Sequence, residues 1–493
     1  MFSLFPIPFS QESKVIEKGF DVDTITFWEK EIYRFLHSPE RRDIVCAENY
    51  YNGDQEILRR KIKMPDGKNN EKALDFLPNH RIVDNQYAKC VDEKKNYLIS
   101  RPITITTRDE DYGKILREYF NKKMHKTLNR VARNSIDKGK SYLYPYYDVN
   151  HELKWKRFNS WEIIPHWLDE DHDEMDSFGR IYSVFEQDRG GEKISKSFFE
   201  LYDYEGIHYF SWDGANLHPT KDRENVPYFT LGDTPLAWAK IPLIVFKRNE
   251  KESPLIRNVK SLQDAINLIE SNFVNVSDQN IYNSILVLVN YDGENLGEFR
   301  EKLAMYGAIK ISTIDGQAGD VKTLNLDVNP ENYKAVLGVL KEALVENARA
   351  FNVKDNRLNS DANQMHIQTA YHDMDLDADD MEVEWQVALE EMLFFVNYDI
   401  QIKGGKIPED HDVTFTFNRN MMIDESQLIQ NCVVSRDIIS DETIRSKHPW
   451  CLDPQKEKEL LDVQKQEQIA YNPIEEIRSA KTVEGTVGGT EEE

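Results

Sequence analysis

The sequence lacks several features that mark common classes of protein. Its 493 residues include only four cysteines, scattered without CxxC spacing, so no zinc site, redox pair or disulfide framework is indicated. No apolar run approaches the roughly 18 residues of a membrane span. The N-terminus has neither a basic region nor a small-residue cleavage site. We therefore expect a cytosolic start and reduced thiols.

Motifs that carry common enzyme chemistry are also missing. The sequence contains no GxSxG, HExxH or GxGxxG, and no GxxxxGK followed by Ser or Thr. RGGEKIS at 189–195 lacks the spacing of a phosphate loop and predicts a hairpin turn. We expect no enzyme, no cofactor, and no catalytic or metal-binding residues.

The charge balance restricts how the chain interacts with nucleic acid. It has 62 Lys and Arg against 87 Asp and Glu, a formal net charge of −25, and a mean hydropathy of −0.64. Tight binding to the DNA backbone depends on Lys and Arg, so a protein that wraps DNA is disfavoured. A protein that lets DNA pass without holding it is compatible with this charge. The length predicts about two to four domains.

Periodic patterns in the first half predict helices followed by a β-rich domain. Apolar spacing predicts helices over 23–36 and 112–138. From 140 to 244, short alternating runs separated by turn residues predict hairpins, and the acidic stretch 167–176 predicts a solvated loop. One further helical face would contain Ile82, Tyr87, Val91, Tyr97 and Leu98.

Two long amphipathic helices are predicted to enclose a small lobe. The first, over 253–280, has apolar residues at three- and four-residue spacing that include Leu262, Ile266 and Ile269. The second, over 330–350, begins with Asn-Pro-Glu, a good capping sequence. Between them the strand ILVLV (285–289), a helix over 296–306 and the strand AIKIS (308–312) predict an α/β insertion. We expect an antiparallel helix pair with this lobe at its tip.

A third long helix, over 367–402, is strongly acidic. It has nine acidic residues and no Lys or Arg between Thr369 and Met392. Because dense like charges destabilise an isolated helix, packing of an apolar side must hold it. That side is predicted to contain Leu376, Val383, Val387 and Phe394. The carboxylates of Asp375, Asp377, Asp379 and Asp380 could hold Mg²⁺, but they surround the helix, which favours a solvated face.

Five segments in order resemble motifs of the portal proteins of tailed phages, in particular those of long-tailed phages of Gram-positive hosts. They are YYNGDQEILRR (50–60), NHRIVDNQYAKCVDEKKNYLISRPI (79–103), IPLIVFKRNEKE (241–252), NSDANQMHIQTAYHDMDLDADDMEVEW (359–385) and SRDIISDETIRSKHPWCLDPQKEKE (435–459). Two departures lie in the fourth segment. Asp361 stands where the family usually has Gly, and Asn363-Gln364 replace the common Leu-Lys.

The resemblance implies an α+β subunit of several domains that forms a ring of twelve copies. Its parts would be an N-terminal helical arm (1–50), a wing (51–252), stem helices (253–280 and 330–350), a clip (281–329), a tunnel loop (351–366), a long kinked acidic helix with a wing strand (367–423), a helical crown (424–470) and a disordered acidic tail (471–493).

The resemblance also assigns residues to these parts. The tunnel loop and DNA channel would use Lys354, Asp355, Arg357, Asn359, Ser360 and Asn363. The clip would dock partners through Asp292, Glu294, Glu298, Arg300, Glu301 and Lys302. The stem would pack through Leu262, Ile266, Ile269, Val336, Leu340 and Leu344.

Partners and location are implied in the same way. Double-stranded DNA would pass non-specifically through the channel. The ring would bind the terminase large subunit, then a head-completion or adaptor protein, and would contact major capsid and scaffold proteins but no membrane. It would assemble in the host cytoplasm and lie at the capsid vertex of the virion.

Three alternatives remain open from the sequence. The first is another ring-forming head–tail connector, although these are usually shorter. The second is an acidic metal-dependent hydrolase that uses Asp375 and Asp377. The third is a DNA-binding module built on Lys122, Lys123, Lys126 and Arg130, which we interpret as a solvated face.

Overall fold

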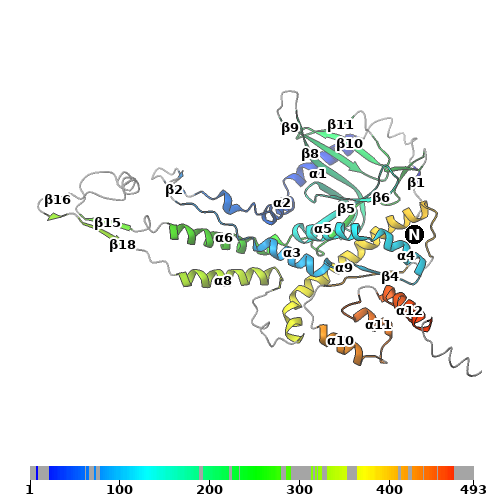
Figure 1. Cartoon of the computed structure of the whole chain (residues 1–493). Helices are drawn as coiled ribbons and strands as arrows, with labels where there is room; N and C mark the ends of the chain where they lie inside the picture. The colour runs from blue at the N-terminus through cyan, green and yellow to red at the C-terminus, as the bar shows by residue number, and fades with distance from the viewer. Residues whose placement is uncertain are drawn as a thin grey trace, which may run out of the picture.

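The structure of the chain is a computed structural model. It describes residues 7–8, 22–61, 63–65, 71–73, 78–187, 193–220, 225–231, 234–278, 285–289, 313–314, 317–318, 320–324, 330–351, 364–408, 412–419, 425–436, 438–451 and 454–470. A body of helices and sheets carries a helix pair, α6 and α8, that extends away from it (Figure 1). The predicted mixture of helix and sheet is confirmed.

Two antiparallel sheets form the β-rich part of the body, as the sequence predicts for 140–244. The three-stranded sheet has the order β14-β5-β6, from β5 (Lys140–Tyr147), β6 (Leu153–Phe158) and β14 (Ile244–Lys247). The five-stranded sheet has the order β11-β10-β9-β8-β7, from β7 (Ile163–Trp167), β8 (Met175–Gln187), β9 (Lys193–Tyr202), β10 (Ile207–Trp212) and β11 (Leu217–Pro219). A small sheet joins β1 (Ile7–Pro8), β12 (Phe229–Leu231) and β13 (Thr234–Ala237).

Side-chain alternation along the strands divides the body into layers. On β8 and β9, Ile181 and Phe199 pack with Trp28 of α1 (Val22–Leu36), whereas Phe178 and Tyr202 face the three-stranded sheet. This alternation follows from the two-residue period of a strand. The other face of the three-stranded sheet is covered by helices, so both of its faces are buried.

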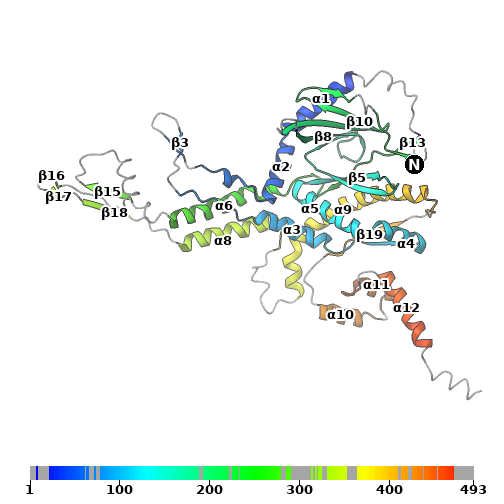
Figure 2. The ribbon, with the colours of Figure 1, turned by 45° about the horizontal axis from the view of Figure 1, so that its top comes forward.

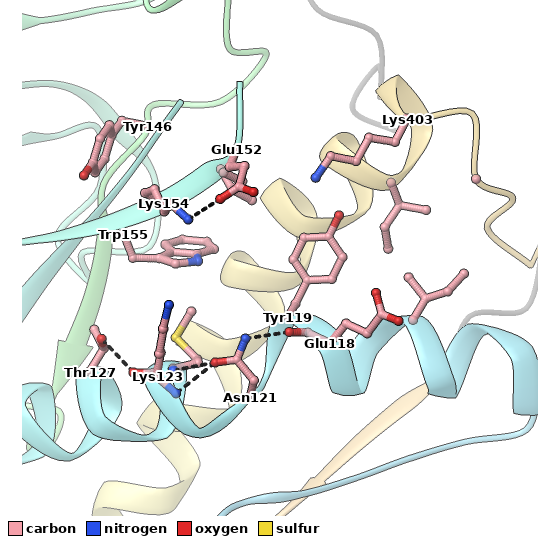
Figure 3. Close-up of a pocket in the computed structure, with 15 residues that line it drawn as sticks. Glu118, Tyr119, Asn121, Lys123, Thr127, Tyr146, Glu152, Lys154, Trp155 and Lys403 are labelled. Atoms are coloured by element: carbon pink, nitrogen blue, oxygen red, sulfur yellow. Dashed lines mark hydrogen bonds and ion pairs between the residues drawn. The ribbon is translucent and has the colours of Figure 1, made fainter. Parts of the chain in front are cut away.

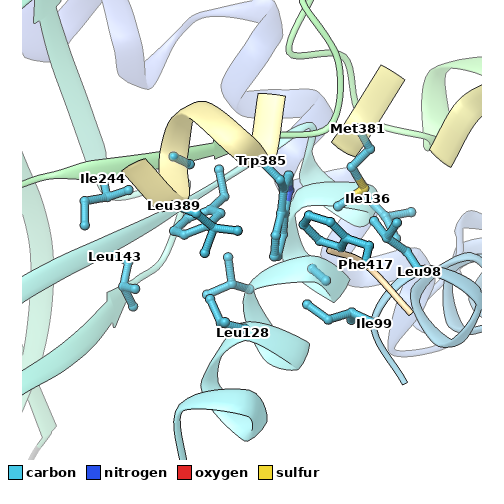
Figure 4. Packing of buried hydrophobic residues seen from close by; sticks show 14 of the residues in the cluster. Leu98, Ile99, Leu128, Ile136, Leu143, Ile244, Met381, Trp385, Leu389 and Phe417 are labelled. Carbon is cyan, nitrogen blue, oxygen red and sulfur yellow. The ribbon is translucent and has the colours of Figure 1, made fainter. Parts of the chain in front are cut away.

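The helical layer contains α3 (Gln86–Ile99), α5 (Lys122–Lys138) and α9 (Gln364–Ile402). Its core brings together Leu98, Leu128, Trp385 and Leu389 with Ile244 of β14 (Figure 4). At about 25 cal/mol per Å² of buried apolar surface, such large side chains dominate the stability of the body. None of the helices in the described part of the chain is long and apolar enough to cross a bilayer.

The prediction of one helix over 112–138 is wrong. The chain forms α4 (Glu110–Tyr119) and then α5, with a break at Phe120 and Asn121. The side chain of Asn121 accepts hydrogen bonds from the N–H groups of Lys123 (2.8 Å) and Met124 (3.2 Å). An Asn that caps backbone donors in this way begins a new helix.

The predicted helix pair is present as α6 (Ile256–Asp278) and α8 (Pro330–Asn347). The two run side by side in both views (Figures 1 and 2). Beyond them, β15 (Ile285–Val289) pairs with β18 (Asp320–Leu324), a strand that the sequence did not predict. The predicted helix over 296–306 and strand over 308–312 lie outside the described residues.

The remaining elements complete the chain. They are α2 (Pro39–Tyr51), the 3₁₀ helix η1 (Glu56–Arg59), the pair β2 (Lys63–Pro65) and β3 (Glu71–Ala73), the pair β4 (Thr104–Thr107) and β19 (Val413–Thr416), the pair β16 (Thr313–Ile314) and β17 (Gln317–Ala318), and the C-terminal helices α10 (Glu425–Val434), α11 (Asp441–Lys447) and α12 (Pro454–Ala470).

Candidate functional site

An extended segment, residues 78–85, lies along α6 and is held by a row of buried polar side chains. These acceptors recur every four residues, so they share one face of the helix. The backbone N–H of Asp84 donates to Asn267 (3.0 Å), that of Ile82 to Ser271 (3.0 Å) and that of His80 to Asn275 (2.7 Å). At the start of α3, the N–H of Tyr87 donates to Gln263 (3.0 Å). The predicted helical face is therefore wrong for Ile82, which lies in this segment before α3 begins.

The two long helices contact each other through charged and aromatic groups. The ammonium of Lys341 on α8 bridges Asp84 (2.6 Å) and Glu270 of α6 (3.0 Å). Further along, the rings of Phe273 and Tyr333 lie 5.2 Å apart. These contacts fix α8 against α6 and against the extended segment.

The side chains predicted for stem packing divide into two groups. Ile266 and Leu344 are buried within the subunit, and Leu262, Ile269 and Leu340 are half-buried. Val336 is 49% exposed, and its neighbour Val339 is 64% exposed. The helix pair thus keeps an outward apolar surface that also includes Leu268 and Phe273.

A group of charges, which we call the hub, lies where α8 ends against the body. It consists of Lys94, Arg248, Arg349 and Asp377. The Asp377 carboxylate accepts hydrogen bonds from Lys94 (2.8 Å) and from Arg248 (3.2 Å). The same Lys94 ammonium donates to the carbonyl oxygen of Arg349 (2.9 Å), a residue in the turn after α8 that has a positive φ of 49°. The hub therefore joins α3, β14, α8 and α9.

Burial makes the hub electrostatically sensitive. The Lys94 and Arg248 side chains are each only 4% exposed. Burial lowers the pKa of Lys94 and would raise that of Asp377. The nearby charges of Lys94 and Arg248 outweigh this, and the pKa of Asp377 lies below its ordinary value. Asp377 is thus an ionised carboxylate between buried cations.

A second cluster lies on the same helix around Arg419, which follows β19. Its guanidinium contacts Asp375 (3.1 Å), Glu382 (2.8 Å) and Asp379. The hydroxyl of Tyr97 also donates to Asp375. These carboxylates raise the pKa of Arg419 above its ordinary value although burial opposes this shift.

The prediction that the acidic residues of this helix form a solvated face is wrong for Asp375 and Asp377, because each is paired with a cation from elsewhere in the chain. The two carboxylates also bind different cations. Among the described residues no group of three or more His, Cys, Asp and Glu side chains is arranged to hold a metal ion. The geometry gives the hydrolase alternative no support.

The apolar side predicted for α9 is also wrong for three of its four residues, since only Phe394 packs against the core. Leu376, Val383 and Val387 are exposed, and Phe394 is half-buried. The side that enters the core is instead formed by Tyr371, Met374, Ala378, Met381, Trp385, Ala388, Leu389 and Met392. The helix therefore has two apolar stripes, of which one stays on the surface.

The residues predicted for DNA and partner contacts are not placed. Those of the tunnel loop are Lys354, Asp355, Arg357, Asn359, Ser360 and Asn363, and those of the clip are Asp292, Glu294, Glu298, Arg300, Glu301 and Lys302. All twelve lie outside the described residues.

Comparison with known protein families identifies the family of this chain. The model of the family "Phage portal protein, SPP1 Gp6-like" matches residues 37–471. The chain belongs to this portal family. Portal proteins are structural components of the phage head–tail connector and not enzymes, as the sequence predicted.

Two curated relatives agree with this assignment. The portal protein of Bacillus phage SPP1 is 27% identical over 429 residues, covering 85% of this chain and 83% of the relative. The portal protein of Clostridium phage phiCD119 is 23% identical over 434 residues, covering 85% and 92%. A chain from a solved structure titled "Neck of native GTA particle computed with C12 symmetry" aligns over 74% of this chain and 90% of its own, with 11% identity and a TM-score of 0.34.

Proposed function

We propose that the chain is one subunit of a homo-oligomeric ring at the capsid vertex, through which DNA enters during packaging and leaves during ejection. The subunits would assemble in the host cytoplasm. Terminase would dock on the ring first and a head-completion protein afterwards. Membership of the portal family supports this proposal.

The observation that best supports the proposed ring is the set of exposed apolar side chains on the helix pair. Val336 and Val339 of α8, with Leu268 and Phe273 of α6, lie exposed on helices that extend beyond the body. Several exposed apolar side chains on neighbouring helices favour a protein interface. Neighbouring copies would cover these side chains, so that α6 and α8 of successive subunits form the wall of a channel.

The other parts follow the family arrangement. Residues 1–50 would form an N-terminal helical arm, the sheets with α3 to α5 the wing, 281–329 the clip, 351–366 the tunnel loop and 424–470 the crown. The hub fixes the carbonyl of Arg349, two residues before 351–366 begin. It would thus give the proposed tunnel loop a rigid point of attachment. The net charge of −25 would keep passing DNA from binding by counterion release.

Deletion of residues 352–363 tests the conducting role. Particles assembled with the shortened chain should form rings and capsids but package or retain less DNA than particles with the full chain. Deletion of the last twelve residues, 482–493, is a matched control of equal length that should package normally. DNA content equal to the full chain in the 352–363 deletion would overturn the tunnel-loop assignment.

A further inference from the structure

The outer stripe of α9 combines apolar and acidic side chains that no element in the described part of the chain covers. Asp380, Val383, Val387 and Glu390 follow each other at three- and four-residue spacing and are all exposed. Val383 is 67% exposed and Val387 is 56% exposed. A solvated face is expected to be polar, and a core-facing side is expected to be buried. Two exposed valines between two carboxylates fit neither description.

A cavity of about 640 Å³ lies beside this stripe, between α9 and the loop that follows β7. Its walls include the apolar side chains of Leu168, Leu243 and Phe394. Its rim is acidic: Asp173, Glu174, Glu384 and Glu390 form no ion pair with any residue that the structure describes. We call the stripe, the cavity and this rim the acidic edge.

The acidic edge holds an excess of negative charge. Burial raises the pKa of Glu384, and the neighbouring carboxylates of Asp173, Glu252 and Glu250 add to the rise although Lys247 opposes it. Lys240 is paired with Glu391 at 2.6 Å. A partner that brings positive charge would relieve this repulsion.

A basic edge lies on α5. Lys122, Lys123, Lys126 and Arg130 share its exposed side, and none of them forms an ion pair within the described part of the chain. Lys123 borders a second cavity, of about 630 Å³, together with Lys154 and Trp155 of β6 (Figure 3). These are the cations that the sequence suggested as a solvated face.

The two edges lie at opposite sides of the same sheet. In the order β14-β5-β6, the acidic edge adjoins β14 through Leu243, Val245 and Lys247, whereas the cavity at the basic edge adjoins β6. Because the two surfaces are oppositely charged and adjoin different edges of this sheet, the acidic edge of one copy can contact the basic edge of the next in a head-to-tail manner. Head-to-tail contacts close into a ring when the rotation between copies permits it.

We propose that the basic edge of α5 binds the acidic edge of the next copy of this chain, and that Val383 and Val387 become buried in that contact. This inference rests on the proposed ring and adds the surfaces that join its subunits within the wing. Complementary charges would set the register of the contact and oppose wrong pairings, while the valines would supply apolar burial.

Two charge-reversal variants test the contact. Variant one carries Lys123→Glu, Lys126→Glu and Arg130→Glu, so both of its edges are acidic. Variant two carries Asp173→Lys, Glu174→Lys, Glu384→Lys and Glu390→Lys, so both of its edges are basic. Each alone should lose ring formation by at least about tenfold at low salt, because like charges face each other. Mixed in equal amounts they should form rings again, with an even number of alternating subunits. Lys30→Glu with Arg34→Glu, two exposed cations of α1, is the matched control and should form rings like the unaltered chain.

Negative-stain electron microscopy and native mass spectrometry distinguish the outcomes. Recovery of rings only in the mixture supports the contact and shows that both variants fold. Rings from either variant alone, or no rings in the mixture while the unaltered chain forms them, would overturn it and leave the proposed function standing. Absence of rings from the unaltered chain would instead refute the proposed function, and this inference with it.

Discussion

Removal of the Asp377 charge on α9 should strongly destabilise the subunit. Asp377→Asn keeps the shape of the side chain but leaves the buried Lys94 and Arg248 without a counter-charge. Breaking a buried ion pair from one side costs about 3–5 kcal/mol, because the remaining charge stays desolvated. The release of Lys94 would also weaken its hydrogen bond to the carbonyl of Arg349.

The matched control is Asp380→Asn, three residues further along the same helix. Asp380 is 64% exposed and lies 3.9 Å from Arg349, so its loss should cost less than about 1 kcal/mol. Urea denaturation followed by circular dichroism measures both free energies of unfolding.

The difference in the free energy of unfolding between the Asp377→Asn chain and the unaltered chain should depend on pH. The pKa of Asp377 in the folded chain is lowered from the unfolded value of about 3.9. Its contribution is therefore fully present above about pH 4 and is lost as pH falls through the folded pKa. The difference in the free energy of unfolding should be largest at pH 7 and should become smaller under more acidic conditions. An Asp377→Asn chain as stable at pH 7 as Asp380→Asn would refute the role of the hub.

Three further changes give distinct expectations. Gly139→Ala should cost more than about 3 kcal/mol in urea denaturation, because φ is +84° and the new Cβ would lie 2.0 Å from a carbonyl oxygen. Gly404→Ala, with φ of +79° but open space around it, should cost about 1 kcal/mol, and equal costs would contradict the steric argument. Burial raises the pKa of Asp137 to about 6, so its contribution to stability is present below about pH 4 and lost as pH rises through 6. Asp137→Asn should therefore stabilise the chain at pH 8 by about 2–3 kcal/mol and change little at pH 4; no gain at pH 8 would show that the carboxylate is not buried as described. Val336→Asp with Val339→Asp should abolish ring formation in electron microscopy while circular dichroism stays unchanged, and intact rings would exclude α8 from the subunit contact.

Local patterns predicted the elements of the helix pair because their information lies in adjacent residues. Three- and four-residue apolar spacing marked 253–280, and Asn-Pro-Glu marked the start of α8. The same rules missed the break before α5, where the capping Asn121 lies within a stretch that keeps helical spacing on both sides. The polar row on α6 was also missed, although its four-residue spacing from Gln263 to Asn275 was visible in the sequence.

The tertiary contacts of α9 and of the hub could not be predicted from a single sequence. Both apolar stripes of α9 have helical period, and periodicity alone does not say which stripe enters the core. The hub depends on Lys94 and Asp377, which are separated by 283 positions. Nothing near either residue in the sequence indicates the other. The sequence therefore predicts a solvated acidic face, whereas Asp375 and Asp377 pair with cations that are distant in the sequence.

The central claim is that copies of this chain form a closed ring with a central channel. Negative-stain electron microscopy of the purified full chain, with its mass measured in parallel at several protein and salt concentrations, tests this most directly. We predict closed rings around a central hole, which head-to-tail contacts can form, with about a dozen copies as the family resemblance implies. A compact monomer at every concentration and salt would contradict the account.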